Sequence, residues 1–262
     1  ARRPMKVRIL GCSGGIGDSG GRPLRTTAML VDDDILIDCG TGAGDLTIVE
    51  LARIDHVFLT HSHFDHIACL PMLIDSVGEL RHRPLTVHAT GATLEALRAH
   101  VFNWAIWPDF LQIPSPAHPA LQFDAIEVGT VVSLGERRIT ALPVRHTVPA
   151  VAFQLASAHA SLVFSGDTGP SPELWTAVNR IDDLRYLLIE TSYTEPERRL
   201  AAASGHLCPS MLAMELAQLK RPAEVFITHL KPTQPDQIMA EIEVRVGSVQ
   251  ARRLQPQQVF EL

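Results

Sequence analysis

Cysteine is scarce in this chain. Its 262 residues include only four cysteines, which stand far apart without a Cys-x-x-Cys pair: Cys12, Cys39, Cys69 and Cys208. Disulfide frameworks need denser cysteine spacing and belong to oxidising compartments. The composition therefore argues against a disulfide-stapled secreted protein and favours a reduced, cytoplasmic setting.

Long apolar runs are also missing. No stretch approaches the roughly 18 to 20 apolar residues that cross a bilayer as a helix. The opening ARRPMKVRIL is basic and then strand-like, without the apolar centre of a signal peptide. We therefore expect a soluble protein with no membrane partner, in which residues 1–4 are an upstream extension or a tag remnant ahead of Met5.

The chain has no surplus of positive charge. It carries 23 lysines and arginines against 29 aspartates and glutamates, for a formal net charge of −6. Proteins that hold long nucleic acids by their phosphates usually present a basic surface. We therefore expect no large nucleic acid partner. A small anionic substrate is compatible with the negative net charge, because a metal ion can supply positive charge locally.

What the sequence does contain is two successive β-rich halves, each closed by helical segments. Short runs such as KVRILG and SLVFSGD predict strands, and those of the first 60 residues read as a largely antiparallel sheet. Residues 103–119, rich in tryptophan and proline, read as a long ordered loop. With no repeat and no break in composition, the pattern predicts a single domain over residues 1–262 built from two packed sheets flanked by helices.

Three histidines and one aspartate crowd into the short stretch THSHFDH. His61 and His63 are two apart on an extended segment and point the same way, while Asp65 and His66 come from the turn into a helix. One turn thus offers two adjacent sets of ligands, which suits two divalent ions about 3.5–4 Å apart. A helix cap would need one acceptor and not four coordinating groups.

Further metal-capable residues follow apolar strands later in the chain. His146 ends LPVRH, Asp167 lies in LVFSGDTGP and His229 lies in VFITHLKP. Each has an ordinary explanation by itself, as a histidine at a sheet edge or an aspartate that caps a helix. Their joint occurrence with the first cluster favours a dinuclear site. Imidazole and carboxylate ligands suit zinc, which we favour, as well as iron or manganese.

The ordered set THSHFDH, strand-end histidine, GDTGP and THL resembles the metallo-β-lactamase superfamily over nearly the whole chain. The resemblance implies a four-layer αββα sandwich of two mixed sheets flanked by helices, with two metals at one rim. It also implies how the ligands divide between the metals, with Asp167 as the bridge: His61, His63 and His146 for the first, and Asp65, His66 and His229 for the second.

A narrower resemblance is to class II cyclic-nucleotide phosphodiesterases, through LGCSGG, DCGTGAG, FSGDTGP, IETSY, SGHLCPS and ITHLKP. It implies hydrolysis of a 3′,5′-cyclic nucleotide such as cAMP or cGMP to the 5′-monophosphate, and a homodimer would be in keeping with its relatives. Two positions depart from that class, since Phe64 replaces a usual leucine and Cys69 a usual glycine or serine. Both lie beside ligands, so they bear on the substrate and not on metal binding.

A dinuclear site of this kind also implies catalytic roles for nearby residues. A water between two divalent ions loses a proton near neutral pH and attacks the phosphorus, with Asp65 orienting this nucleophile. His206 in SGHLCPS is the candidate to protonate the leaving oxygen or grip the phosphate, and Glu190 is the candidate to orient His206. Trp107, with Trp104, is expected to stack on a purine, although plain packing would explain both.

Three alternatives stay open at this stage. A tRNA 3′-processing endonuclease of the same superfamily shares the ligands, but the acidic charge and the lack of a lysine-rich arm weigh against it. A lactone or thioester hydrolase would use the same metals on carbon. A degenerate sensor would lack ligands, and none is missing. β-Lactam hydrolysis is disfavoured because cysteine stands at the Asp167 position in the zinc β-lactamases that the resemblance brings to mind.

Overall fold

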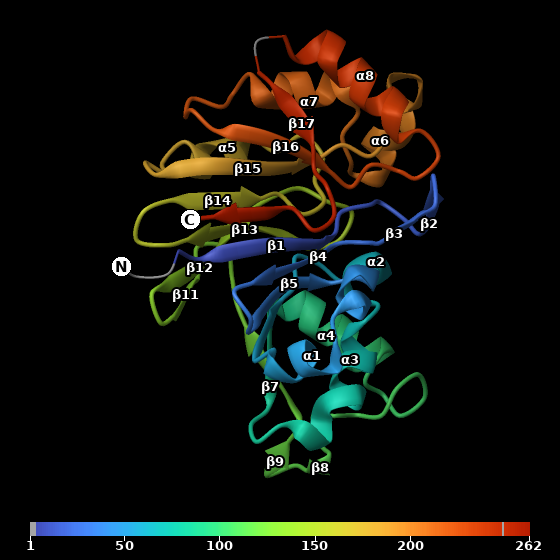
Figure 1. The fold of residues 1–262 in the computed structure, drawn as a ribbon, viewed down its shortest axis with the longest axis vertical. Helices are drawn as coiled ribbons and strands as arrows, with labels where there is room; N and C mark the ends of the chain where they lie inside the picture. Colours follow the sequence, from blue (N-terminus) through green and yellow to red (C-terminus); the bar gives the residue numbers. More distant parts are fainter. Residues whose placement is uncertain (1–3, 248) are drawn as a thin grey trace.

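Within residues 4–247 and 249–262, which the computed structural model describes, two seven-stranded β-sheets lie face to face with helices outside them (Figure 1). The predicted αββα architecture is confirmed. The proposed extension at residues 1–4 falls mostly outside the described residues. The strands of the first sheet, in spatial order, are β10 (Leu121–Ala125), β7 (Leu85–Ala89), β6 (His56–Phe58), β5 (Ile35–Cys39), β4 (Ala28–Val31), β1 (Lys6–Gly11) and β18 (Val259–Glu261).

The first sheet is mixed. β1, β4 and β5 pair antiparallel, as the sequence of the first 60 residues predicts, but β5, β6, β7 and β10 pair in parallel. The parallel part arises because each of these later strands is reached by a crossover through helical segments. The last strand, β18, returns across the whole chain to pair antiparallel with β1.

The second sheet follows the same plan. Its strands, in spatial order, are β11 (Val131–Leu134), β12 (Arg137–Pro143), β13 (Val151–Ala156), β14 (Ser161–Phe164), β15 (Leu184–Glu190), β16 (Glu224–Thr228) and β17 (Ala251–Arg253). The strands from β11 to β14 pair antiparallel, and those from β14 to β17 pair in parallel. The carboxyl ends of β14, β15 and β16 therefore lie at one edge of the sheet.

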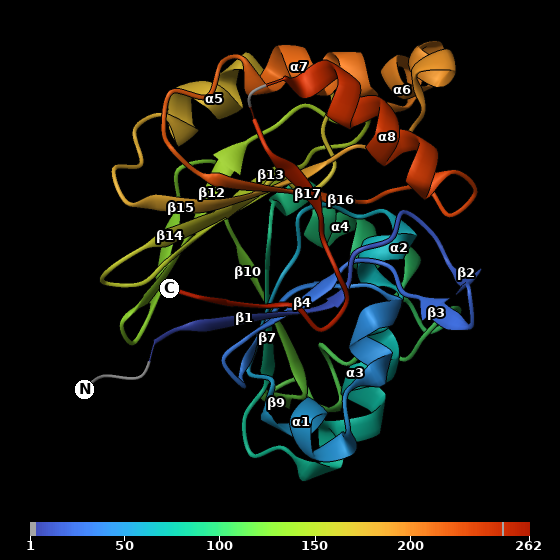
Figure 2. The ribbon, with the colours of Figure 1, turned by 45° about the horizontal axis from the view of Figure 1, so that its top comes forward.

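Helices cover the outer faces of both sheets (Figure 2). Those on the first sheet are η1 (Thr41–Asp45), α1 (Ile48–Arg53), α2 (Phe64–Ile67), α3 (Leu70–Val77), η2 (Gly78–Leu80) and α4 (Gly91–His100). Those on the second are α5 (Pro172–Val178), η3 (Glu195–Glu197), α6 (Arg198–Ser204), α7 (Pro209–Leu216) and α8 (Pro235–Val246). Two small hairpins complete the fold: β2 (Gly17–Ser19) with β3 (Arg22–Leu24), and β8 (Pro114–Ser115) with β9 (His118–Pro119). The second hairpin lies within the segment predicted as a loop.

Alternation along the strands divides the apolar side chains between layers. In β5, Ile35 and Ile37 enter the core between the sheets, whereas Leu36 joins the core beneath α3 and α4. In β15, Leu188 lies between the sheets and Ile189 joins the core beneath α5, α7 and α8. Successive side chains of a strand point to opposite faces, so strands covered on both sides are continuously apolar. This accounts for the unbroken apolar runs of the sequence.

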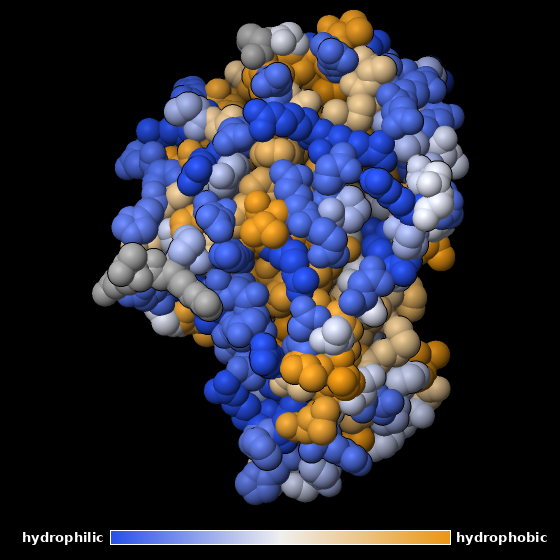
Figure 3. Space-filling view, in the orientation of Figure 1, coloured by the Kyte–Doolittle hydropathy of each residue, from blue (hydrophilic) through white to orange (hydrophobic). Residues whose placement is uncertain are grey.

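None of the helices in residues 4–247 and 249–262 has the length and apolar character needed to cross a bilayer. The face seen in Figure 3 is largely hydrophilic, with apolar side chains gathered where α1 lies in Figure 1. The exposed Ile48 and Val49 belong to that helix. α1 is held at its start by a capping box, in which Thr47 and Glu50 each bond the backbone N–H of the other.

Candidate metal centre

The metal-capable side chains follow the carboxyl ends of strands. Asp167, Glu190 and His229 come at or just after the ends of the parallel neighbours β14, β15 and β16. In the first sheet, His61 follows β6, which is parallel to β5. Parallel strands bring their carboxyl ends together, which is where open α/β sheets build their sites. The fold therefore collects residues more than 160 positions apart in the sequence.

The first group of ligand atoms comes from His61, His63, His146 and Asp167. Nε2 of His146 lies 3.1 Å from Nδ1 of His63 and 3.9 Å from Oδ2 of Asp167. Nε2 of His61 lies 3.6 Å from the same carboxylate oxygen. The structure thus brings together the three histidines that were predicted for one metal.

The second group comes from Asp65, His66, His229 and the other oxygen of Asp167. Nε2 of His66 and Nε2 of His229 are 3.4 Å apart, and each lies 3.3 Å from Oδ1 of Asp167. Oδ2 of Asp65 lies 3.2 Å from Nε2 of His229. The Asp167 carboxylate therefore presents one oxygen to each group, in the place predicted for a bridge.

These residues fit divalent cations. A tetrahedral zinc ion with bonds of about 2.0–2.1 Å separates its ligand atoms by about 3.3–3.4 Å, and the separations in both groups scatter around that value. Nε2 of His61 and Oδ1 of Asp167 are fully buried and have no hydrogen-bond partner among the described residues. A buried polar atom is costly unless it is satisfied, and a cation would satisfy both. The donor set of nitrogen and carboxylate oxygen is also the one that zinc accepts.

Outward hydrogen bonds orient the imidazoles. Nδ1 of His146 donates to the Gly205 carbonyl at 2.8 Å, and Nδ1 of His66 donates to the Asp38 carboxylate at 2.7 Å. A carbonyl or carboxylate oxygen only accepts, so Nδ1 of each ring carries a proton and Nε2 is the atom that faces the site. His61 is held in the same way, because its Nδ1 lies 2.9 Å from the Thr60 hydroxyl.

Asp38 was missed by the sequence analysis, although it stands at the end of the apolar run ILIDC. Its carboxylate is fully buried and accepts the backbone N–H of Thr60 at 2.8 Å as well as the bond from His66. The backbone of Asp38 has φ of 55°, and that of His229 has φ of 61°. Left-handed conformations are unfavourable for these residues and often mark functional sites.

The local electrostatics suit bound cations. Burial lowers the pKa of His61 and of His146, so both rings are neutral ligands at neutral pH. Burial opposes ionisation of Asp65, but the hydrogen bond from His229 outweighs it and lowers the pKa of that carboxyl. The carboxylates of Asp167 and Asp38 similarly outweigh burial and raise the pKa of His66. The field at this point favours positive charge, whether a proton or a metal ion.

A second set of polar contacts borders the two groups. Nδ1 of His206 donates to Oε1 of Glu190 at 2.6 Å, as predicted for an orienting carboxylate, and its Nε2 remains to reach a ligand. Glu190 is fully buried and also accepts the Thr168 N–H at 3.1 Å and the Ser192 hydroxyl at 3.0 Å. With the Leu207 N–H at 3.4 Å it accepts four hydrogen bonds, which fills its bonding capacity. Asp167, Glu190 and His206 are close enough to hold an ion, but we interpret them as a hydrogen-bonded support.

Trp107 lies in the long segment between α4 and β10. It is half-buried and packs against the core beneath α3 and α4, and its backbone bonds Val101 and Trp104. Among the described residues, no ring contact joins Trp107 to either ligand group. Its role in stacking on a base stays a prediction.

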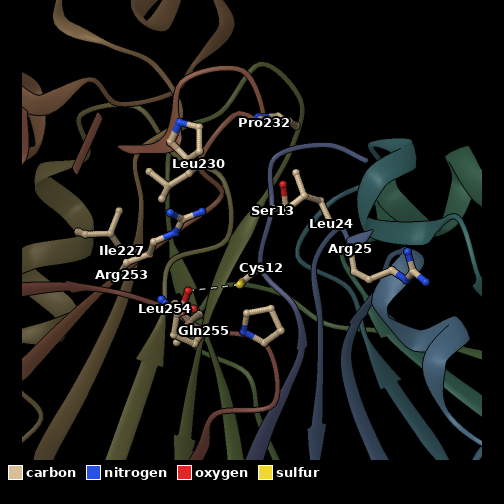
Figure 4. A pocket seen from close by; sticks show the side chains of 12 residues that line it. Cys12, Ser13, Leu24, Arg25, Ile227, Leu230, Pro232, Arg253, Leu254 and Gln255 are labelled. Carbon is tan, nitrogen blue, oxygen red and sulfur yellow. Dashed lines mark hydrogen bonds between the residues drawn. The ribbon is translucent and has the colours of Figure 1, made fainter. Parts of the chain in front are cut away.

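A small cavity of about 50 Å³ lies behind the His229 turn and is not part of this site (Figure 4). Cys12 borders it and donates from Sγ to the Leu254 carbonyl at 3.6 Å. Burial raises the pKa of the Cys12 thiol to about 12, so it is not a reactive thiolate. The contribution of Cys12 is structural: its carbonyl accepts the His229 N–H at 2.8 Å.

Comparison with known proteins agrees with the resemblance seen in the sequence. A family model described as the beta-lactamase superfamily domain matches residues 33–230. A Yersinia pestis protein named "Probable 3′,5′-cyclic-nucleotide phosphodiesterase" is 27% identical over 206 residues, 69% of this chain and 58% of that protein. Ribonuclease Z from Halorubrum lacusprofundi is 30% identical over 130 residues, 47% of this chain and 42% of that protein.

The chain thus spans about half the length of these curated relatives. Among solved structures, that of unliganded yeast PDE1 superposes with a TM-score of 0.79 at 18% identity, and the match covers 100% of both chains. At that identity the likeness concerns the fold alone.

Proposed function

This chain belongs to the family described as the beta-lactamase superfamily domain, and from that premise we propose that it hydrolyses a small phosphodiester with two divalent cations. The observation that carries the proposal is the pair of four-atom ligand groups that share Asp167, bordered by a histidine held on a buried carboxylate. The relative named as a cyclic-nucleotide phosphodiesterase supports a 3′,5′-cyclic nucleotide as the substrate.

The cations would be zinc, with iron or manganese as alternatives that the same ligands accept. His61, His63 and His146 would hold one, Asp65, His66 and His229 the other, and Asp167 both. When bound, they would supply positive charge for the phosphoryl oxygens and make the attacking water easier to deprotonate.

The chain's own residues would then guide the reaction. Asp65 is half-buried at the edge of the second group, where its carboxylate can accept a hydrogen bond from the attacking water. As the water oxygen bonds to phosphorus, the bond from phosphorus to the ribose 3′ oxygen breaks and that oxygen needs a proton. His206 donates it from Nε2, and Glu190 on Nδ1 stabilises the charged ring before transfer.

The first test measures metal content and substrate range together. The purified chain should contain close to two equivalents of a divalent metal by elemental analysis and should hydrolyse cAMP or cGMP in a panel of cyclic mono- and dinucleotides. If the chain hydrolyses no nucleotide but hydrolyses a homoserine lactone, the site acts on a carbonyl carbon and not on phosphorus. Cleavage of a precursor tRNA in preference to the nucleotides would favour the ribonuclease Z relatives.

The second test separates the ligands from the acid. Asp65→Ala should lose metal and hydrolysis of a chromogenic phosphodiester, whereas Asp33→Ala, at an exposed aspartate away from the site, should lose neither. His206→Ala should keep its metal and lose about 10²–10⁴-fold in turnover of a cyclic nucleotide. Loss of metal from His206→Ala would identify that residue as a ligand instead.

A further inference from the structure

His229 has a polar partner on the side that faces away from the ligand group. Nδ1 of His229 lies 3.0 Å from the hydroxyl oxygen of Ser192, which is fully buried two residues after the end of β15. No pattern in the sequence predicts a role for Ser192. The Ser192 hydroxyl thus connects His229, in the second ligand group, with Glu190, which holds His206.

The direction of these hydrogen bonds follows from the chemistry of the groups. The Ser192 oxygen lies 3.0 Å from Oε2 of Glu190, and a carboxylate can only accept, so the hydroxyl proton points to Glu190. The hydroxyl lone pairs are then left to accept a proton from Nδ1 of His229. Nε2 is the atom that faces Asp65 and Asp167, and without a cation it donates to Oδ2 of Asp65 at 3.2 Å. A cation bound there would replace that proton, and the neutral ring would keep its proton on Nδ1.

Glu190 therefore acts on two histidines with its two oxygens. Oε1 accepts directly from Nδ1 of His206 at 2.6 Å, and Oε2 orients the hydroxyl that accepts from His229. The rings of His206 and His229 lie parallel, 5.4 Å apart between centroids. A displacement of the Glu190 carboxylate would therefore change the orientation of both rings.

We propose that Ser192 is a positioning residue, which passes the orientation of the buried Glu190 carboxylate to His229 and so keeps Nε2 of that ring available to a cation. The proposal rests on the metal centre of the proposed function, but not on the nature of the substrate. Asp38 plays the corresponding part for His66, and the Gly205 carbonyl does so for His146. Loss of such outer partners commonly weakens metal binding by about 10–100-fold.

The effect should be confined to one of the two ligand groups. Ser192→Ala removes the acceptor from His229, whose ring can then place its proton on Nε2 and face the group with an N–H. His61, His63 and His146 form no hydrogen bond with Ser192 among the described residues. A general loosening of the fold would instead weaken both cations.

The experiment compares Ser192→Ala with Ser171→Ala, which removes the same hydroxyl from an equally buried serine that bonds neither ligand group. Zinc binding is measured by competition with a chromophoric chelator in the full-length protein. The expected result is about 10–100-fold weaker binding of one zinc equivalent in Ser192→Ala, with the other unchanged and both unchanged in Ser171→Ala. Unchanged binding, or equal weakening of both equivalents, would overturn the proposal.

A second measurement does not depend on a folded variant or on catalysis. In the zinc-loaded wild-type protein, the imidazole ¹⁵N shifts of His229 should show a proton on Nδ1 and zinc on Nε2. Zinc on Nδ1, or no proton on that atom, would refute the inference even if the enzyme proves to be a phosphodiesterase. If the chain hydrolyses none of the phosphodiesters, the proposed function fails, while zinc affinities and ring protonation still decide the role of Ser192.

Discussion

Gly205 offers a sharp test of how backbone conformation supports the site. It ends α6 with φ of 69°, and its carbonyl accepts the Nδ1 proton of His146. A Cβ built on Gly205 would lie 3.0 Å from Nδ1 of His146 and 3.1 Å from the backbone nitrogen of Thr147. Alanine at this position must therefore either displace the His146 ring or move the segment that carries His206.

The size of the effect can be divided into two parts. A left-handed conformation costs a residue with a Cβ about 1–2 kcal/mol relative to glycine. Overpacking in a filled region adds about 1–3 kcal/mol. Gly205→Ala should thus lower the free energy of unfolding by about 2–5 kcal/mol, the sum of these two ranges.

Gly135 is the matched control. It has φ of 64° in the turn between β11 and β12, but a Cβ there would meet no atom within 4 Å. Gly135→Ala should show only the conformational cost, about 1–2 kcal/mol, with wild-type metal content and turnover. Urea denaturation gives the first quantity, and elemental analysis and phosphodiester hydrolysis give the others.

The two variants separate the effect of the contact with His146 from the cost of a left-handed backbone. We expect Gly205→Ala to lose metal from the group that contains His146 and to lose turnover, beyond any loss in Gly135→Ala. Equal destabilisation of the two variants, with full metal and activity in both, would refute the account of Gly205 as a support for His146.

Three further predictions concern other parts of the molecule. Asp38→Asn keeps an acceptor for the Thr60 N–H but turns an amide N–H₂ toward Nδ1 of His66. Zinc affinity in a chelator titration should therefore fall about 10–100-fold. Unchanged affinity would contradict the role of Asp38 in orienting His66. Burial lowers the pKa of His88 despite the bond to Asp124, so below its ordinary value of 6.5 the unfolded chain binds a proton that the folded chain does not. Urea denaturation should therefore show stability falling with pH below that value, and by less in His88→Gln; equal losses would be evidence against it. Phe64 is 74% exposed between two ligands, so Phe64→Leu should leave metal content unchanged and stability within about 0.5 kcal/mol, while KM for cyclic nucleotides changes; a loss of metal would show that this side chain supports the ligands.

Much of the fold could be predicted because the local sequence of many strands itself favours strand structure. KVRILG forms β1 at its predicted limits, and the start of SLVFSGD, Ser161–Phe164, forms β14. The pairing partners could not be read in the same way. The contact of β18 with β1 joins the two ends of the described chain, and no local pattern encodes it.

The ligand cluster was readable for a physical reason. His61, His63, Asp65 and His66 lie within one extended segment and the first turn of a helix, so their proximity follows from backbone geometry alone. For His146, Asp167 and His229 the sequence showed only that each follows an apolar strand. Their meeting depends on the parallel order of β14, β15 and β16 and on the packing of one sheet against the other.

By itself the sequence determined the chemical character of this protein: a turn crowded with nitrogen and carboxylate ligands, and strands whose ends carry the remainder. Only the tertiary structure decided how the histidines are held. Asp38, Ser192 and the Gly205 carbonyl act on rings 28, 37 and 59 residues away. A serine or a backbone carbonyl has no sequence signature of its own, and it acquires a direction and a partner only when the two sheets close around it.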